Sequence, residues 1–459
     1  MDRILCFLIY IISAFARFSK ALARLGLGSY EEWKPGSPLK ILMVGYNGAR
    51  NTGADARVVA IVDQLRELFG PDKIRITVMT LNEKTLAGYF PEDVRLLRFS
   101  SIFPLDLYRA CCTHHAAILC EGSALKSTFA NALSLFFCEA AGIMDAQKKP
   151  CIAYGSEVGK MDAFLRKAAS RLCRNTYFIT RTRESQKVLE SLGLTGHVGT
   201  DTAWSYRDAL DAEHTDALLK KAGWDGKKPL LGIAVMNPFC WPVRASFGKW
   251  VKGLITNTHD GQYDKWYYFS DSPARRRAFR HYIRSIAGAV NLFRQEQDFF
   301  PVLIGMERLD AQACRALKKA LGIPCAAFLS GECSADIMSG VLLRLSLLIT
   351  SRYHAAVLSI RNGCPIAAVS IDERLDSLMR ELALDRRALL HASDKDLADR
   401  LCLTLGNIYG GRKQIHMQLV RKYAQYQIKL DEMGIFLRDY LLAGLGASGD
   451  QPLTLRHNH

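Results

Sequence analysis

The sequence predicts an α/β protein in which two Rossmann-like, doubly wound domains face a cleft and a long helix follows them. Short apolar runs alternate with segments of helical spacing along most of the chain, which is typical of parallel sheets covered by helices on both faces. The alternation stops at a Gly-, Lys- and Pro-rich stretch, residues 220–229, and then starts again. Since 459 residues are also too many for one compact core, the restart predicts a second domain.

The first series of elements follows a linker, residues 31–40, with two prolines and a glycine. Its strands are almost uninterrupted apolar runs, the pattern of strands buried on both faces. We expect strands at 39–46, 73–80, 115–122, 150–159 and 176–181, and helices at 57–70, 132–149, 162–175 and 183–193.

The second series repeats this layout. We expect strands at 230–237, 299–306, 325–330, 344–351 and 365–371, and helices from about 247, at 310–322 and at 354–363. A long helical pattern at 412–442 and a frayed tail at 446–459 follow. The expected parts are therefore an N-terminal apolar helix with its linker, a first domain, a second domain, and a C-terminal helix with its tail, at residues 1–39, 40–222, 223–400 and 401–459. Such a pair of domains is GT-B-like.

The composition is that of a folded soluble enzyme, but the charge is unusual. The chain carries 61 Lys and Arg against 45 Asp and Glu, a net charge of +16, which favours anionic partners such as phosphates, acidic glycans or anionic lipid. We see no nucleic-acid recognition module, so nucleic acid is not expected as a partner. The thirteen cysteines are scattered without metal-ligand spacing, which indicates reduced thiols in a cytosolic protein.

The N-terminus is apolar from Ile4 to Ala16, which is shorter than the roughly 20 residues that span a bilayer. Arg17, Lys20 and Arg24 follow it, and a signal-peptide pattern is absent. Two interpretations stay open: a helix in the membrane interface with basic residues near anionic headgroups, or a helix packed on the protein's own surface. An exposed, unpaired apolar face would favour the membrane. We expect a cytoplasmic protein, either free or peripheral at the inner face of the cell membrane.

The stretch "LLITSRYHAAVLSI", residues 347–360, places Arg352 and His354 between an expected strand and an expected helix. In doubly wound sheets, ligands bind outside the carboxyl ends of the strands and against helix N-termini. Arg supplies a charged fork for a carboxylate or phosphate, and His can move a proton near neutral pH. A lone turn His is more often structural, but its pairing with Arg352 in this loop favours a site.

The segment from Leu347 to Leu384 resembles the signature of the polysaccharide pyruvyl transferase family. The family pattern has an Arg-Leu-His turn, a Gly-x-Pro and a Ser-Tyr-Asp segment; the matching residues here are Ser351, Arg352, Tyr353, His354, Ala355, Gly363, Pro365, Ser370, Ile371 and Asp372. Tyr353 replaces the usual Leu, and Arg374 stands where the family often has Lys.

Three further segments extend the resemblance to about residues 40–385. "GYNGARNTGADARV" resembles the family's Gly-rich loop, with matches at Gly45, Gly48, Asn51 and Gly53. The Gly-Asp-Glu-Ala that usually follows is Gly-Ala-Asp-Ala here, which leaves only Asp55. The remaining matches are Arg181 and Ser185 in "YFITRTRESQKVLESLG" and Asp201 in "VGTDTAW". A Gly-Gly-Gly-Ser loop of the family is reduced to Gly122 and Ser123, since Cys120 and Glu121 replace glycines.

The resemblance implies transfer of a pyruvyl group from phosphoenolpyruvate to two hydroxyls of a sugar, giving a cyclic ketal and phosphate. It requires cations for the doubly anionic donor, and Arg352, Arg181 and Arg374 are the candidates. His354 is the candidate general acid and base. No metal and no cofactor besides the donor substrate are expected. The acceptor is a sugar of a cell-surface polysaccharide or exopolysaccharide, or its lipid-linked precursor. The acceptor loop would comprise Gly45, Asn47, Gly48, Asn51, Gly53, Asp55, Glu121 and Ser123. A loop Asp is more often a helix N-cap, and Asp55 is expected just before a helix.

Other interpretations remain open at this point. A GT-B nucleotide-sugar glycosyltransferase would use a Glu such as Glu373 for ribose hydroxyls, and a degenerate sugar-binding homologue would fit the altered glycine loop. The basic cluster at 275–284 is either a solvated face or a site for anionic headgroups or a lipid diphosphate. Aromatic residues at 239–250 and 263–269 could stack on sugars. His114 and His115 point to opposite faces of a strand, so joint metal ligation is not expected.

Overall fold

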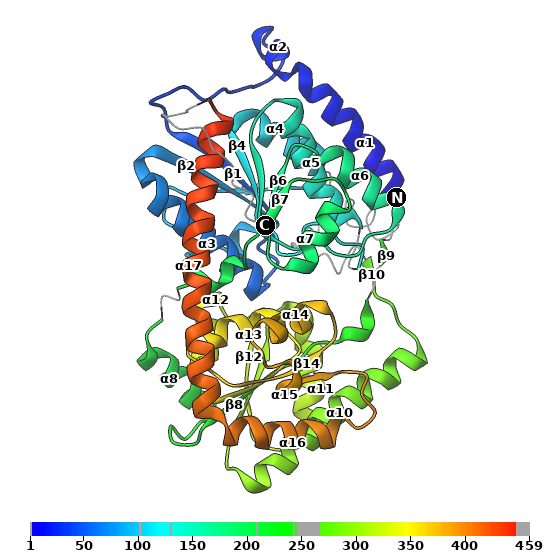
Figure 1. Cartoon of the computed structure of the whole chain (residues 1–459), viewed down its shortest axis with the longest axis vertical. Helices are drawn as coiled ribbons and strands as arrows, with labels where there is room; N and C mark the ends of the chain where they lie inside the picture. The colour runs from blue at the N-terminus through cyan, green and yellow to red at the C-terminus, as the bar shows by residue number, and fades with distance from the viewer. Residues whose placement is uncertain are drawn as a thin grey trace.

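Two parallel sheets organise the protein, each covered by helices on both faces (Figure 1). The computed structural model describes residues 2–100, 103–128, 131–207, 210–241, 244–245 and 267–446. The first sheet has seven strands in the order β3-β2-β1-β4-β5-β6-β7. They are β1 (Leu39–Asn47), β2 (Ile74–Thr80), β3 (Arg95–Arg98), β4 (Ala116–Leu119), β5 (Cys151–Ser156), β6 (Tyr177–Thr180) and β7 (Gly196–Val198).

The second sheet repeats this topology with six strands, β12-β11-β8-β13-β14-β15. They are β8 (Leu230–Ala234), β11 (Phe300–Gly305), β12 (Ala326–Leu329), β13 (Leu347–Thr350), β14 (Ile366–Ser370) and β15 (Leu389–His391). All strand pairs within both sheets are parallel. The predicted fold class, two Rossmann-like domains, is confirmed.

Helices connect successive strands and cover both sheets. In the first domain they are α3 (Thr52–Phe69), α4 (Phe103–Thr113), α5 (Asn131–Ala146), α6 (Ala163–Leu172) and α7 (Arg183–Glu190). In the second they are α10 (Pro273–Glu296), α11 (Ala311–Leu321), α12 (Ala335–Leu343), α13 (Tyr353–Ile360), α14 (Glu373–Glu381), α15 (Asp385–Ala388) and α16 (Leu397–Gly410). Before the second sheet, α8 (Ala212–Lys221) packs on α12, and Gly340 leaves room for Thr215.

Several boundaries differ from the sequence expectation. Helix α3 begins at Thr52, five residues before the expected start at Arg57, because the side chain of Asn51 caps it by accepting hydrogen bonds from Gly53 N and Ala54 N. The polar start of this helix hid its first turn from the apolar pattern. Strand β3 and helices α4 and α12 were not expected. The helix expected from about 247, most of both aromatic segments and the expected tail after Gly446 lie outside the described residues.

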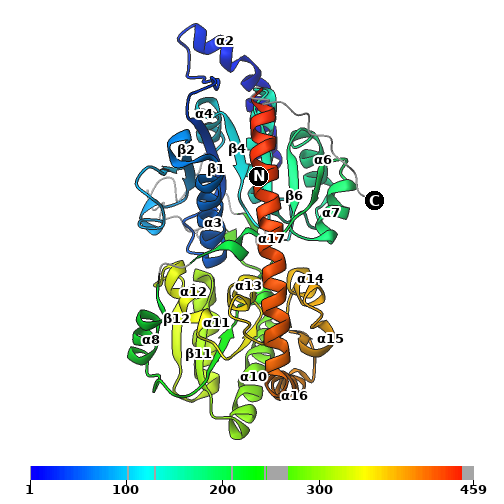
Figure 2. The same ribbon diagram turned by 60° about the vertical axis from the view of Figure 1, so that its left-hand side comes forward.

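The C-terminal helix α17 (Arg412–Gly444) returns from the second domain to the first and runs along both (Figure 2). Met433 packs against Gly199, and the hydroxyl of Tyr440 donates to the carbonyl of Cys151 at 3.1 Å. The last four turns of α17 thus complete the core of the first domain.

The N-terminal helix α1 (Asp2–Phe15) and the short helix α2 (Ser19–Arg24) lie at the outer edge of the first domain (Figure 1). Cys6, Ile9 and Ala16 join the domain core, and α1 contacts α5 and α4. The segment Asp2–Arg24 is long and apolar enough to cross a membrane by length and composition.

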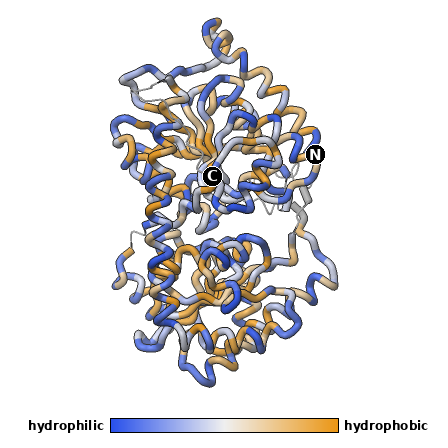
Figure 3. The backbone as a smooth tube through the Cα atoms, viewed as in Figure 1, coloured by the Kyte–Doolittle hydropathy of each residue, from blue (hydrophilic) through white to orange (hydrophobic). Residues whose placement is uncertain are grey.

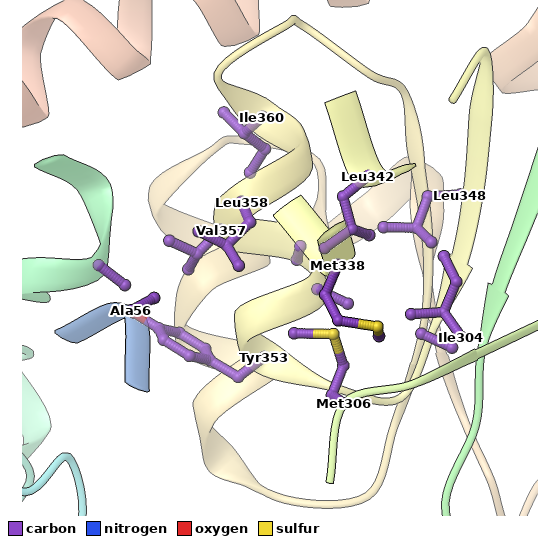
Figure 4. Packing of buried hydrophobic residues seen from close by; sticks show 14 of the residues in the cluster. Ala56, Ile304, Met306, Met338, Leu342, Leu348, Tyr353, Val357, Leu358 and Ile360 are labelled. Atoms are coloured by element: carbon purple, nitrogen blue, oxygen red, sulfur yellow. The ribbon is translucent and has the colours of Figure 1, made fainter. Parts of the chain in front are cut away.

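The two domains meet at the carboxyl ends of their central strands. The backbone N–H of Thr52 donates to the carbonyl of Met306 at 2.9 Å, and Asn51 forms a β-bridge with Glu307. Apolar side chains also meet at this boundary: Tyr353 of α13 points toward Ala56 of α3 (Figure 4). In each sheet the strand order reverses at this edge, between β1 and β4 and between β8 and β13. Both topological switch points, where such sheets bind ligands, therefore face each other.

Candidate functional site

The turn between β13 and α13 carries the two residues that the sequence singled out. Arg352 is the N-cap residue of α13, and His354 lies in the first turn of that helix. The side chain of Thr350 stabilises the turn, because its Oγ1 accepts from Arg352 N at 2.9 Å. The turn thus presents His354 to the first domain.

Three nitrogens, two from the first domain and one from the second, lie close to a single oxygen of Asp201. Its Oδ2 lies 2.8 Å from Arg57 Nη1 and 3.0 Å from Arg181 Nη1. Nε2 of His354 approaches the same oxygen at 3.5 Å across the domain boundary. The other oxygen, Oδ1, accepts from Ala203 N at 2.9 Å and so fixes the carboxylate. Burial opposes ionisation, yet Arg57, His354 and Arg181 hold the pKa of Asp201 well below its usual range.

A second carboxylate continues the network toward the second domain. Glu157 pairs with Arg181 Nη2, and its Oε1 lies 2.8 Å from Lys126 Nζ. Lys126 Nζ also lies 2.8 Å from Glu373 Oε1 in the second domain. Although burial raises the pKa of Glu157, Arg181 and Lys126 lower it more, so the carboxyl is ionised. Ion pairs therefore cross the boundary at Lys126–Glu373 and at Glu184–Arg380, and His354 meets Asp201 across it.

Two glycines shape the site because they have no side chain. A Cβ on Gly122 would lie 3.1 Å from Arg181 Nη1 and 3.5 Å from Arg57 Nε. A Cβ on Gly53 would lie 2.0 Å from His354 Nδ1, so any other residue there would displace the imidazole. Among the described residues, Arg57 Nε and Arg181 Nε have no hydrogen-bond partner. The site thus holds unsatisfied cationic donors beside bare backbone.

The environment of His354 favours a neutral imidazole. Burial lowers the pKa of His354 below its ordinary 6.5; Asp201 opposes this shift, while Arg181 and Arg57 add to it. The ring also stacks edge-on against Tyr353 at 5.1 Å between centroids. The ring centroid of Tyr353 in turn lies 4.7 Å from the guanidinium carbon of Arg181, a cation–π contact across the boundary. Tyr353, which stands where the family usually has Leu, thus contacts both Arg181 and His354 through its ring.

Arg352 and Arg374 are placed differently from Arg181. Arg352 Nε donates to Asp310 Oδ2 at 2.8 Å, and its Nη2 donates to Glu307 Oε2 at 3.0 Å. Arg374 Nε donates to Asp372 Oδ2 at 2.8 Å. Burial lowers the pKa of Arg374, but the pairing with Asp372 outweighs this effect and raises it. Both side chains thus have carboxylate partners within the second domain, and their role toward a donor stays a prediction.

The glycine-rich loop is docked between the domains. The buried side chain of Asn47 donates to the carbonyl of Met79 at 2.9 Å, and Asn51 caps α3. Gly48 has a φ of +78°, where a Cβ would lie 2.3 Å from Thr80 Oγ1. A Cβ on Gly45 would meet Cys120 Sγ at 2.6 Å. These four residues give the loop its shape, and their assignment to an acceptor stays a prediction.

Three polar residues of the expected acceptor loop lie near this network. Asp55 belongs to the first turn of α3, so the alternative that it caps the helix is wrong; Asn51 does so. Burial raises the pKa of Asp55 to about 7, and its Oδ1 has no hydrogen-bond partner among the described residues. Glu121 Oε1 accepts from Gly122 N at 2.9 Å, and Ser123 Oγ donates to Glu157 Oε2 at 3.3 Å.

The sequence expectation missed Arg57, Lys126 and Glu157 as members of the site. The signal for Arg57 was present, because it interrupts the otherwise apolar run "AxVVAIV" at residues 56–62. Arg57 is 0% exposed, and its Nη2 also donates to the carbonyl of Tyr154 at 3.1 Å. A charge within a buried helical face needs a partner, which the sequence alone does not name.

The histidine pair 114–115 lies away from this site. Nδ1 of His114 is 2.7 Å from the carbonyl of Ala110, and Nδ1 of His115 accepts from Lys40 N at 3.1 Å. No cluster of three metal-binding side chains occurs in the part of the chain that the structure describes. All thirteen cysteines fall in that part and are free thiols.

Replacing Asp201 with Asn should lower the free energy of unfolding by about 3–5 kcal/mol, since it removes the carboxylate partner of buried Arg57 and one of the two carboxylates paired with buried Arg181. A guanidinium chloride titration measures this effect. The matched control is Asp216→Asn, which removes the partly exposed pair with Arg344 and should cost about 1 kcal/mol or less. Equal effects of the two substitutions would contradict the role of Asp201.

Comparison with known proteins agrees with the fold. The two-domain arrangement resembles a protein of Listeria monocytogenes assigned as a UDP-N-acetylglucosamine 2-epimerase, with a TM-score of 0.58, 11% identity, and coverage of 90% of this chain and 98% of that one. The UDP-GlcNAc 2-epimerase of Neisseria meningitidis gives a TM-score of 0.52 at 10% identity, covering 88% and 100%. That of Rickettsia bellii gives 0.52 at 11%, covering 89% and 98%. These likenesses show a GT-B-like fold only.

A search of the curated proteins finds no match. The family model described as polysaccharide pyruvyl transferase matches residues 51–373, which include α3, Asp201 and the β13–α13 turn. This match covers well over half of the chain, and the chain belongs to the polysaccharide pyruvyl transferase family.

Proposed function

We propose that the protein transfers the pyruvyl group of phosphoenolpyruvate to two hydroxyls of a sugar, forming a cyclic ketal and releasing phosphate. The acceptor that we propose is a sugar of a cell-surface polysaccharide or exopolysaccharide, or its lipid-linked precursor. The observation that carries the proposal is the meeting of His354 with the buried guanidiniums of Arg57 and Arg181 at the facing edges of the two domains.

The donor would bind to the arginines beside Gly122. Phosphoenolpyruvate carries a carboxylate and a phosphate, and guanidinium forks bind both groups with paired hydrogen bonds. Arg57 and Arg181 each keep an Nε–H without a partner among the described residues, and Gly122 leaves the space next to them open to a ligand atom. Arg374 and Arg352 would join after exchanging a carboxylate partner for the donor.

His354 would move the proton of the first acceptor hydroxyl. A neutral imidazole takes this proton while the hydroxyl oxygen bonds to C2 of phosphoenolpyruvate, and the imidazolium then delivers the proton to C3, which becomes the methyl group. The second hydroxyl then displaces the phosphate from C2, and its proton leaves with the phosphate. The arginines stabilise the charge that builds on the leaving group. Atoms and protons balance without a metal or a cofactor.

The acceptor hydroxyls would be oriented by the first domain. Asp55 offers a buried carboxyl oxygen without a partner among the described residues, close to the domain boundary. A sugar hydroxyl would satisfy that oxygen, which otherwise costs free energy. Glu121 and Ser123 follow β4 at the same edge of the sheet. The assignment of these side chains to the acceptor follows from their position beside the donor arginines.

Substrates would enter when the domains separate at this boundary. His354 lies 3.5 Å from Asp201, and Lys126 lies 2.8 Å from Glu373, so these contacts must open to admit a ligand. A doubly anionic donor would replace the carboxylates that the cations lose, so no buried cation would be left without an anionic partner.

The glycosyltransferase alternative receives less support from the site. Glu373, which would hold ribose hydroxyls, is paired with Lys126 and half exposed. The degenerate-homologue alternative rests on the reduced glycine loop. However, the retained Gly122 is the residue of that loop against both guanidiniums, so the loss of the other glycines leaves this contact intact.

The direct test incubates the protein with phosphoenolpyruvate and a panel of p-nitrophenyl glycosides, and follows phosphate. We expect acceptor-dependent phosphate release that falls by about 100-fold or more in His354→Ala, the range of a general acid–base residue. The control is His391→Ala on the exposed surface of the second domain, which should leave the rate unchanged. UDP release from UDP-sugars without phosphate release from phosphoenolpyruvate would overturn the proposal in favour of a glycosyltransferase.

The pH dependence follows from the lowered pKa of His354. Because the base form of the imidazole is the neutral one, activity is retained as pH falls until the lowered pKa is reached. We expect kcat/KM for phosphoenolpyruvate to stay level from pH 8 to about 6.5 and to fall only below that value. An acidic limb with a midpoint above 6.5 would contradict a neutral, buried imidazole.

A further inference from the structure

The helix pair α1–α2 carries apolar side chains on two opposite faces. The inner face packs into the core of the first domain through Cys6, Ile9 and Ala16. The outer face remains exposed, by 45–68% of each side chain, at Ile4, Phe7, Leu8, Ile11, Phe15 and Phe18. These positions recur every three or four residues, so they form one stripe along the helix, roughly 100° wide. Figure 3 shows the helix as a mainly hydrophobic segment at the outer edge of the molecule.

Three exposed arginines flank this stripe along the chain. Arg3, Arg17 and Arg24 are exposed, and Asp2 is the one acidic residue among residues 2–30. Leu25 and Leu27, which are 73% and 69% exposed, extend the apolar surface past α2. A contiguous apolar surface with basic flanks is the composition of helices that lie in the interface of an anionic bilayer.

We propose that the α1–α2 face docks on an anionic lipid bilayer, with α1 lying in the plane of the membrane surface. A second copy of the chain fits the face less well, since two such faces would bring their arginines together on a molecule of net charge +16.

The packing of the inner face argues against a helix that crosses the membrane. The segment Asp2–Arg24 has sufficient length and hydropathy to span. However, Ser13 packs closely against Gly142 of α5, where an added Cβ would lie 2.9 Å from Ser13 Oγ. Ile9 is 0% exposed. Extracting α1 into a bilayer would uncover the apolar core of the first domain beneath it.

The stripe begins next to the functional edge of the first domain. Asp2 interacts with Asn131, whose Nδ2 donates to Asp162 Oδ2 at 2.8 Å. Asp162 N donates to Ser127 Oγ at 3.0 Å, one residue after the Lys126 that contacts the second domain. A docked α1 would hold this edge beside the bilayer, where a lipid-linked acceptor is presented; this last point rests on the function proposed above.

The test is co-sedimentation of the full chain with vesicles of phosphatidylcholine alone or with 30% phosphatidylglycerol. We expect binding to the anionic vesicles that weakens in 0.5 M NaCl, and at least tenfold weaker binding of the double variant Phe7→Glu with Ile11→Glu. The same substitution at Leu403, 69% exposed on α16, is the matched control and should bind as the wild type does. Alkaline carbonate should release the bound protein.

Three results would overturn the proposal: no binding of the wild type to anionic vesicles, equal binding of the double variant, or resistance to carbonate, which indicates a spanning helix. A light-scattering mass that falls from dimer to monomer in the double variant, without vesicle binding, would assign the face to a second copy. A further variant, Phe7→Ser with Ile11→Ser, adds no charge and should also bind more weakly. Phosphate release with a soluble acceptor should be unchanged in these variants, so failure of this inference is separable from failure of the proposed function.

Discussion

Oδ2 of Asp201 is the point on which the functional edge of both domains depends. Two guanidiniums and an imidazole approach it, and Asp201 itself is 0% exposed. A buried ion of one sign is costly unless ions of the other sign surround it, so the arginines, the carboxylate and the boundary position of His354 stabilise one another. Arg57 belongs to α3, Arg181 follows β6 and His354 begins α13, so three distant parts of the sequence are held in register by one carboxylate.

This arrangement also explains how one structure can be stable without a ligand and still receive an anion. Three cations of this network pair with three carboxylates, so their charges sum to zero when the boundary is closed. The cations are Lys126, Arg57 and Arg181, and the carboxylates are Asp201, Glu157 and Glu373. Hydrogen-bond donors at Nε of both arginines nevertheless remain unsatisfied among the described residues. An anionic ligand would complete these donors and replace the contacts that cross the boundary. The cost of opening and the gain of binding therefore involve the same side chains.

Much of the fold could be predicted from the sequence, because buried parallel strands are recognisable as short apolar runs. The turn that carries Arg352 and His354 was located for the same reason, since β13 ends at Thr350, within one residue of the expected end. The ion-pair partners could not be predicted. Arg352 meets Asp310, 42 residues away, and Arg57 meets Asp201, 144 positions later in the chain. Such pairs depend on how distant elements of one domain fold together, which local pattern does not encode. The cap of α3 was missed because Asn51 and Asp55 are both able to cap a helix.

Calorimetric titration of phosphoenolpyruvate tests most directly whether the arginines around Asp201 bind the donor. The account predicts that Arg57→Met, verified as folded by circular dichroism, binds phosphoenolpyruvate at least tenfold more weakly than the wild type. Arg315→Gln on the exposed surface of α11 should bind it as the wild type does. Unchanged affinity in folded Arg57→Met would contradict the central claim and would place the donor elsewhere on the protein.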